Sequence, residues 1–361
     1  MSRSLIAVLI VTFTSVVDAG TLHVNAKATG QGSGVSWIDA CTSIQDALGR
    51  GKAGDEIRVA EGSYTGPIVL KSGVRLVGGF AANGTSEVQP NGFLHATLIS
   101  GNGTARCMVG ENLGPETVIR GFRIENGYCD VPDVGAGLYL ENSSAVFVEC
   151  VFTNNRTDFM GGAVAIMGGA PQFINCRFTQ NDGGMGAGAV FSHREASPAF
   201  LNCLFDRNVA GEAGAVALIT GSARFTNCTL ADNAASVGNG GALFDTRGES
   251  IIHNSILWNN QSPTVTSNEV YNYPVFERQT AIGNSTVSGG WPGAANDAKD
   301  PLFVMALEGD YRLMEMSPCR DLGSVELFQG ENVSDYGETD LGQRSRVVGA
   351  SIDRGAYEFV P

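Results

Sequence analysis

A short alternation of apolar and polar residues recurs five times between Phe147 and Asn260. The copies are FVECVFTNN, FINCRFTQN, FLNCLFDRN, FTNCTLADN and IHNSILWNN, and they follow one another at intervals of 25 to 27 residues. The alternation has the period of a β-strand and not that of a helix. A repeat of this length is too short to hold two packed helices, so the pattern predicts strands joined by turns and stacked as a solenoid.

Stacked copies place like side chains above one another at about 4.8 Å. Asparagine tolerates the left-handed backbone that a corner needs, and its side chain can bond to its copy in the next coil. We therefore predict an all-β fold, a single-stranded right-handed parallel β-helix, whose hand follows the usual crossover rule for parallel strands. The predicted structural ladder consists of Cys150, Cys176, Cys203, Cys228, Phe152, Phe178, Phe205, Asn155, Asn181, Asn208, Asn233 and Asn260.

The pattern changes at both ends of this ladder. An apolar run after Arg3 is typical of a secretory signal peptide and is too short to span a bilayer. Further on, an amphipathic stretch predicts a helix that Ser36 and Asp39 would cap and that would cover the first coil. The expected parts are a signal peptide (1–19), an N-terminal strand and capping helix (20–53), parallel coils (54–260, with a regular ladder at 119–260), and irregular final coils with a C-terminal cap (261–361).

Composition narrows the class of protein. The chain contains 48 glycines and has a net charge of -14, which fits a turn-rich β protein and argues against nucleic-acid binding, since that requires a basic surface. Eight cysteines in an exported protein would normally suggest disulfides. We expect the four cysteines of the ladder to be free and buried. The better disulfide candidates, in pairings that the sequence leaves open, are Cys41, Cys107, Cys129 and Cys319.

Between the buried columns runs a strip of residues that should face outward. Arg177 and Asp206 are diagonal neighbours on it, about 7 to 8 Å apart at the backbone. Either the strip is a shallow groove that binds sugar hydroxyls or carboxylates, with Trp258 stacking on a ring, or it is a solvated face with ordinary cross-strand ion pairs. The candidate ligand-binding residues are Arg123, Glu125, Arg177, Asp206 and Trp258.

Other polar residues suggest chemistry less directly. His193 is either a general base oriented by Glu195 or part of a polar loop, because residues so close on an extended chain point apart. No two histidines have the spacing of zinc ligands, so we expect no resident metal or other cofactor. Asp130, Asp133 and Asp182 are candidates for calcium, although no repeat-type calcium motif accompanies them.

Several segments resemble known families. The stretches WIDACTSIQDAL, GGWPG, DPLF, GDYRL and TDLGQRSRVVGASIDRGAYEF resemble exported bacterial β-helix proteins of the choice-of-anchor Q type. The GGAV and GGAL motifs at Gly161 and Gly240, with the Phe-x-x-Asn motifs, are similar to repeats of polymorphic outer membrane proteins, which are surface adhesins. Both resemblances imply the pectin lyase fold, which hosts lyases, hydrolases and proteins without enzymatic activity.

In lyases of that fold, the resemblance implies a lysine or arginine base beside acidic calcium ligands; in glycoside hydrolases it implies clustered aspartates with companion histidines. Neither set occurs in series here. A lysine base on the ladder is excluded, because the only lysines are Lys27, Lys52, Lys71 and Lys299.

The main hypothesis is therefore a monomeric binding, adhesive or structural module, associated with a polysaccharide or another cell-surface ligand. We expect it to be secreted or held at the cell surface, with the periplasm also compatible, and to have no transmembrane segment in the mature chain. The alternative is a polysaccharide-degrading enzyme, a lyase or glycoside hydrolase, that uses arginine or carboxylates on the outward strip.

Overall fold

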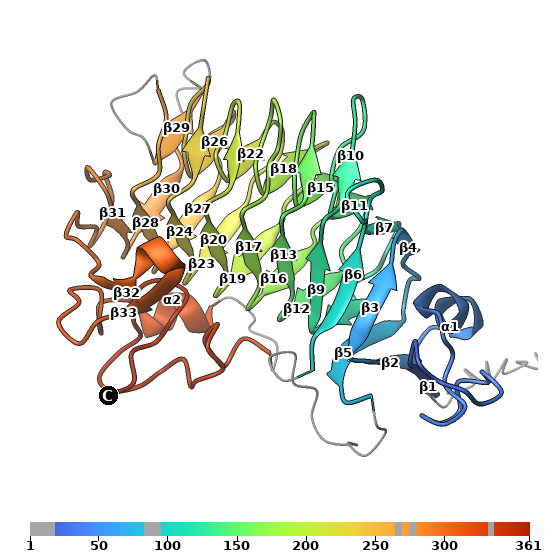
Figure 1. Cartoon of the computed structure of the whole chain (residues 1–361). Helices are drawn as coiled ribbons and strands as arrows, with labels where there is room; N and C mark the ends of the chain where they lie inside the picture. The colour runs from blue at the N-terminus through green and yellow to red at the C-terminus, as the bar shows by residue number, and fades with distance from the viewer. Residues whose placement is uncertain (1–18, 83–94, 264–268, 274–278, 331–335) are drawn as a thin grey trace, which may run out of the picture.

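The computed structural model describes residues 19–82, 95–263, 269–273, 279–330 and 336–361. The expected signal peptide, apart from its last residue, lies outside the described residues. The described chain forms a right-handed parallel β-helix, in which each complete coil contributes one strand to each of three parallel sheets (Figure 1).

The strands of each sheet are hydrogen-bonded in the following order. Sheet A contains β1 (Thr21–Val24), β2 (Glu56–Ala60), β5 (Arg75–Phe80), β8 (Val118–Arg120), β12 (Val146–Val148), β16 (Gln172–Ile174), β19 (Ala199–Leu201), β23 (Arg224–Thr226), β27 (Ile251–His253) and β30 (Ala281–Gly283). Sheet B contains β3 (Gly62–Thr65), β6 (Thr97–Ser100), β9 (Phe122–Glu125), β13 (Val151–Thr153), β17 (Arg177–Thr179), β20 (Leu204–Asp206), β24 (Thr229–Ala231), β28 (Ile256–Trp258) and β31 (Thr286–Val287). Sheet C contains β4 (Ile68–Val69), β7 (Met108–Glu111), β11 (Leu138–Glu141), β15 (Val164–Met167), β18 (Val190–His193), β22 (Val216–Leu218), β26 (Leu243–Asp245) and β29 (Val270–Asn272).

Small two-stranded pairings extend some of the turns, namely β10 (Tyr128–Cys129) with β14 (Arg156–Thr157) and β21 (Val209–Ala210) with β25 (Ala234–Ala235).

The core of the solenoid consists of stacked columns of identical side chains. Phe152, Phe178 and Phe205 pair in register on sheet B, with neighbouring rings 5.0 and 4.6 Å apart between centroids and nearly parallel. Burying a large apolar side chain contributes about 1.5–3 kcal/mol. Because this burial is repeated in each coil, the observed register of strand pairing is strongly favoured. A shift of one residue would turn the whole column of side chains outward.

A second column consists of asparagines at the corner after sheet B. Asn181 is fully buried; its amide donates to Phe152 O at 3.0 Å and to Asn208 Oδ1 at 2.9 Å. The same pattern links Asn155 to Asn181 and continues through Asn233 to Asn260. Because each amide satisfies a buried group of the coil on either side, the ladder joins the coils by polar contacts as well as by packing.

The N-terminal helix is shorter than the sequence pattern predicts. Helix α1 (Ile44–Arg50) begins with Ser43, whose side chain accepts a hydrogen bond from Asp46 N, so the predicted cap at Ser36 and Asp39 is wrong. The preceding stretch forms bends and turns, and it pairs with strand β1 at Cys41, whose N donates to His23 O. The helix contacts β1, β2 and β4, and it lies at the N-terminal end of the solenoid (Figure 1). None of the described helices is long and apolar enough to cross a lipid bilayer.

The C-terminal section does not simply close the last coil. The core at that end is covered by Trp291, whose Nε1 donates to Thr280 O at 3.2 Å. The chain then returns along the flank of the solenoid (Figure 1). This C-terminal flank (residues 301–330 and 336–358) includes the antiparallel strands β32 (Phe303–Met305) and β33 (Asp310–Leu313), a 3-10 turn at Ala306–Glu308, and helix α2 (Val325–Gln329).

The segment that resembles the choice-of-anchor Q ending forms a buried polar cluster. Arg346 is completely buried and donates to the carbonyl oxygens of Asp353 and Gly355 at 2.7 and 2.6 Å. Arg354 binds Asp297 at 2.6 Å and thereby ties the flank to the loop after β31. Gly355 has a φ of 90°, and a Cβ there would lie 2.7 Å from Thr229 Oγ1, so this position favours glycine.

All eight cysteines are buried and free, so none of the disulfides suggested for Cys41, Cys107, Cys129 and Cys319 is present. Burial raises the pKa of Cys107 to about 12 and that of Cys319 to about 11, which keeps both thiols protonated and unreactive at neutral pH.

Candidate functional site

The outward strip of sheet B is not an open surface along its length. Asp206, predicted to face solvent, is fully buried. The reason is the C-terminal flank: Tyr311 and Ala356 pack against Leu204 and Ala231 of the strip. Asp206 is therefore neither open to a ligand nor solvated, although the cross-strand ion pair with Arg177 that the second alternative included is present.

Asp206 instead lies in a buried ion-pair cluster. Arg177 donates to its two carboxylate oxygens at 3.0 and 3.1 Å, Thr179 Oγ1 donates at 2.8 Å, and Arg207 Nε donates at 2.9 Å. Burial alone would lower the pKa of Arg177, but the carboxylate of Asp206 raises it above its ordinary value. A guanidinium held in its charged form in this way cannot accept a proton from a substrate, which argues against Arg177 as the base of a lyase.

The other residues predicted for ligand binding lie in two separate pockets. Arg123, paired with Glu125 at 2.5 Å, lines a pocket of about 760 Å³ together with Arg177 and the flank residue Tyr357. Trp258 is half-buried and lines a different pocket of about 270 Å³, against the turn at Ala306–Glu308. The structure thus brings Arg123 and Arg177 to one pocket but places Trp258 elsewhere.

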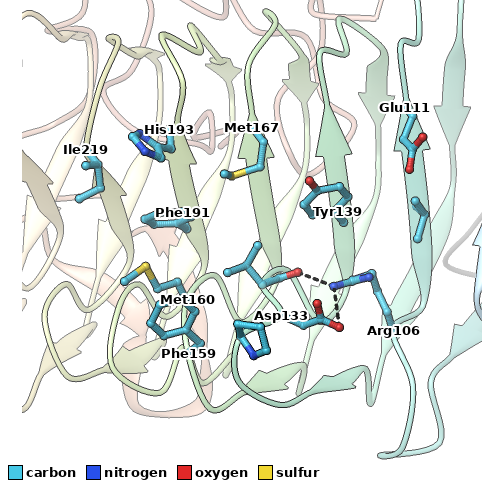
Figure 2. A pocket seen from close by; sticks show the side chains of 13 residues that line it. Arg106, Glu111, Asp133, Tyr139, Phe159, Met160, Met167, Phe191, His193 and Ile219 are labelled. Atoms are coloured by element: carbon cyan, nitrogen blue, oxygen red, sulfur yellow. Dashed lines mark hydrogen bonds and ion pairs between the residues drawn. The ribbon is translucent and has the colours of Figure 1, made fainter.

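A further groove lies on the outer face of sheet C, and its lining includes two residues that the sequence suggested for other roles, His193 as a general base and Asp133 as a calcium ligand. This sheet C groove, shown in Figure 2, has a volume of about 650 Å³ and crosses five neighbouring strands from β7 to β22. Its exposed lining is mainly apolar. The lining residues are Arg106, Val109, Glu111, Pro132, Asp133, Val134, Tyr139, Phe159, Met160, Met167, Phe191, His193 and Ile219.

Strand register explains how the sheet C groove is built. Val109, Tyr139 and Phe191 belong to one outward column and form the floor, in which Phe191 is only 6% exposed. A second column, which includes Met167 opposite His193, forms one wall. The other wall comes from turns before the strands, including Phe159, and Figure 2 shows the two walls on opposite sides of Phe191.

Polar groups gather at the β7 end of the sheet C groove. Arg106 donates from Nε to Gly135 O at 2.9 Å and from its NH2 group to Val134 O at 2.8 Å, and its guanidinium lies 5.2 Å from the centre of the Tyr139 ring. The hydroxyl of Tyr139 donates to Glu141 at 3.2 Å. These bonds fix both side chains, so the polar end of the groove is preorganised.

His193 is not oriented by Glu195. Its Nδ1 is 2.9 Å from Thr220 Oγ1, whereas both carboxylate oxygens of Glu195 accept hydrogen bonds from Arg247 at 2.9 Å. The two side chains have separate partners, so the general-base alternative has no support, and the pair lies at a turn in which Arg194 and Glu195 have positive φ values, as the polar-loop alternative expected.

Two of the three carboxylates suggested as calcium ligands lie beside arginines. Asp133 lies 3.9 Å from Arg106, and Asp182 lies 3.8 Å from Arg156. Within the described ranges, no three His, Cys, Asp or Glu side chains are grouped closely enough to hold a metal ion.

A sequence signal for the sheet C groove did exist. The phrases GAGLYL, GGAVAI and GAGAVF are apolar at outward as well as inward positions, unlike the alternating strands of the other repeat. A strand that is apolar on both faces indicates that its outer face is also covered or used in binding.

Comparisons with known proteins agree with this architecture. A family model described as a right handed beta helix region matches residues 116–280. Among solved structures, the chain is similar to the pectate lyase Pel9A, with 15% identity and a TM-score of 0.51, covering 94% of this chain and 97% of that one. A pectin methylesterase from Aspergillus niger gives 15% identity, a TM-score of 0.39, and coverage of 78% and 87%. No curated protein matches the sequence. The protein is thus a right-handed parallel β-helix of the pectin lyase-like fold.

Proposed function

We propose that the protein is a carbohydrate-binding β-helix module whose binding site is the sheet C groove. The observation that carries the proposal is an open groove of about 650 Å³ with aromatic and methionine side chains along it and fixed polar groups at one end. Mainly apolar sites with a few placed polar groups are typical of ligand binding. The apolar faces of sugar rings pack on aromatic side chains, while their hydroxyls require hydrogen-bonding partners.

The direction of the groove suits a linear chain. It runs across the strands, along the axis of the solenoid, so its length follows the strand spacing of about 4.8 Å and comes to roughly 19 Å over five strands. One pyranose unit of an extended 1,4-linked glycan advances by about the same distance as one coil. Affinity should therefore rise with oligosaccharide length up to about four units and then level off.

Features of the sequence support the proposed location and family. We propose that the protein is exported as a monomer, by means of the expected signal peptide at residues 1–19, and acts at the cell surface or in the medium. Its ending resembles that of choice-of-anchor Q proteins, and the buried cluster around Arg346 gives that ending a structural role in holding the flank. The repeats of polymorphic outer membrane proteins, which are surface adhesins, support adhesion as the outcome of glycan binding.

Affinity electrophoresis and titration calorimetry with a panel of soluble polysaccharides and oligosaccharides of increasing length test the proposal. Replacing Tyr139 by Ala should weaken binding by roughly three- to tenfold, because an aromatic contact contributes about 0.5–1.5 kcal/mol. The matched control is Trp258→Ala, which removes a half-buried aromatic residue from a different pocket and should leave binding unchanged. Equal losses in both variants, or no binding to any glycan, would contradict the assignment.

The same incubations separate the module from the enzymatic alternative. Polysaccharide products are analysed for new reducing ends and for unsaturated ends. A lyase or hydrolase acting at the strip would release such ends, and Arg177→Lys would reduce their yield, whereas the proposed module leaves the polymer length unchanged.

A further inference from the structure

Among the described residues that line the sheet C groove, Arg106 is the only arginine or lysine, and it is already engaged. Two of its donor groups bond to backbone carbonyl oxygens at 2.9 and 2.8 Å, and its side chain is only 19% exposed. Recognition of a carboxylate by arginine favours two parallel N–H donors directed at the anion. Arg106 cannot present its Nε and NH2 donors in this way without breaking contacts that hold the turn around Val134.

The carboxylates of the sheet C groove are more accessible. Asp133 lies at the rim with 65% of its side chain exposed, and its nearest cation is the same Arg106, at 3.9 Å. Glu111 is exposed and makes no side-chain hydrogen bond or ion pair with any other residue that the structure describes. The described lining therefore presents two carboxylates and one engaged guanidinium, on a chain whose net charge is -14.

Resting on the proposed function, we infer that the sheet C groove selects an uncharged glycan and rejects polyuronates. Hydroxyl groups of a neutral sugar can donate to Glu111 and Asp133, whereas the carboxylates of a uronate would meet these side chains at like charge. Such repulsion suppresses the wrong partner and slows its approach. The expected ligand thus differs from the pectate named for the structural neighbour, although the fold is shared.

The test compares two soluble polymers with the same linkage: a neutral 1,4-glucan and its derivative oxidised to carboxylates at C6. In affinity electrophoresis of the whole protein at low salt, the affinity for the neutral polymer, derived from the retardation, should be at least tenfold higher than the affinity for the oxidised polymer. Raising the salt should narrow this ratio, because screening acts on the charged polymer alone. Equal or stronger binding of the oxidised polymer at low salt would overturn the inference and leave the proposed function standing.

Variants at one position sharpen the result. Replacing Glu111 by Gln should raise affinity for the oxidised polymer by roughly twofold to fivefold, in line with the contribution of an exposed charge pair, and Glu111→Lys should raise it further. The control Glu315→Lys makes the same charge change at an exposed position on the C-terminal flank and should have no such effect. If Glu315→Lys matches Glu111→Lys, net charge and not the groove sets the preference, and the inference is wrong. If neither polymer nor any other glycan binds, the proposed function fails, and this inference with it.

Discussion

The asparagine ladder offers the sharpest test of what holds the coils together. Asn208 is fully buried between two copies of itself. Its Oδ1 accepts hydrogen bonds from the backbone N and the side-chain amide of Asn181 at 3.1 and 2.9 Å. Its own amide donates to Phe178 O and to Asn233 Oδ1, both at 2.9 Å. Asn208→Ala therefore removes four buried hydrogen bonds in a single step.

The expected loss follows from these four bonds. Each contributes about 1 kcal/mol net, and a buried donor left without a partner costs about 1–3 kcal/mol. The backbone N–H of Asn181 is such a donor in the variant, since its acceptor is Asn208 Oδ1. We expect Asn208→Ala to lower the free energy of unfolding by about 4–6 kcal/mol. The cavity left by the amide adds to this value.

Equilibrium unfolding in urea, followed by far-ultraviolet circular dichroism, measures the effect. The matched control is Gln172→Ala, which removes an amide from an exposed position on β16 and should change the free energy of unfolding by no more than about 0.5 kcal/mol. A loss below about 1 kcal/mol for Asn208→Ala would show that packing alone fixes the coils and would refute the role assigned to the ladder.

Three further predictions concern buried groups. Burial raises the pKa of Glu269, a hydrogen-bond acceptor for Asn260, to about 8, and that of Glu358 also to about 8. The native state then holds protons that the unfolded chain releases, so the free energy of unfolding should fall as pH rises from about 4.5 to 8. Urea titrations at several pH values measure this slope. Glu269→Gln should remove about half of it, because one of the two buried carboxyl groups is then absent. Asp206→Asn leaves its arginine partners without a carboxylate and should lower the free energy of unfolding by about 3–5 kcal/mol in the same assay. A decrease below about 1 kcal/mol would refute the cluster as a stabilising contact. In thermal unfolding, Phe178→Ala should lower the free energy of unfolding by about 3–5 kcal/mol, and Phe178→Leu should lower it clearly less. Equal decreases in the two variants would contradict the stabilising role of the phenylalanine column.

Much of the solenoid could be predicted from the sequence because each of its contacts recurs at a fixed interval along the chain. Each residue of the ladder meets its copy one coil away, as Phe152 meets Phe178 and Asn155 meets Asn181. Such a contact imposes the same side chain at a regular interval, and the interval is visible as a repeat. The repeat therefore indicates the strand period, the inward columns and the parallel pairing directly.

The packing of the C-terminal flank, which closes the strip of sheet B, could not be predicted in the same way. Burial of Asp206 depends on Tyr311, and the hydrogen bond between Asn175 and Tyr336 O joins residues 161 positions apart. Contacts of this kind occur once in the chain and leave no periodic trace. The helix at Ile44 likewise begins later than its pattern suggested, because pairing with β1 outweighs local helix preference.

The coils are predictable from the amino-acid sequence, since their contacts repeat from one coil to the next. Which outer faces remain open depends instead on contacts between distant parts of the chain. The C-terminal flank covers the strip of sheet B at Leu204 and Ala231, whereas no described segment covers the groove beside Tyr139 on sheet C. The physical reason is that exposure of a strand face depends on which distant segment packs against it, and that packing is set by the shape and polarity of both surfaces together.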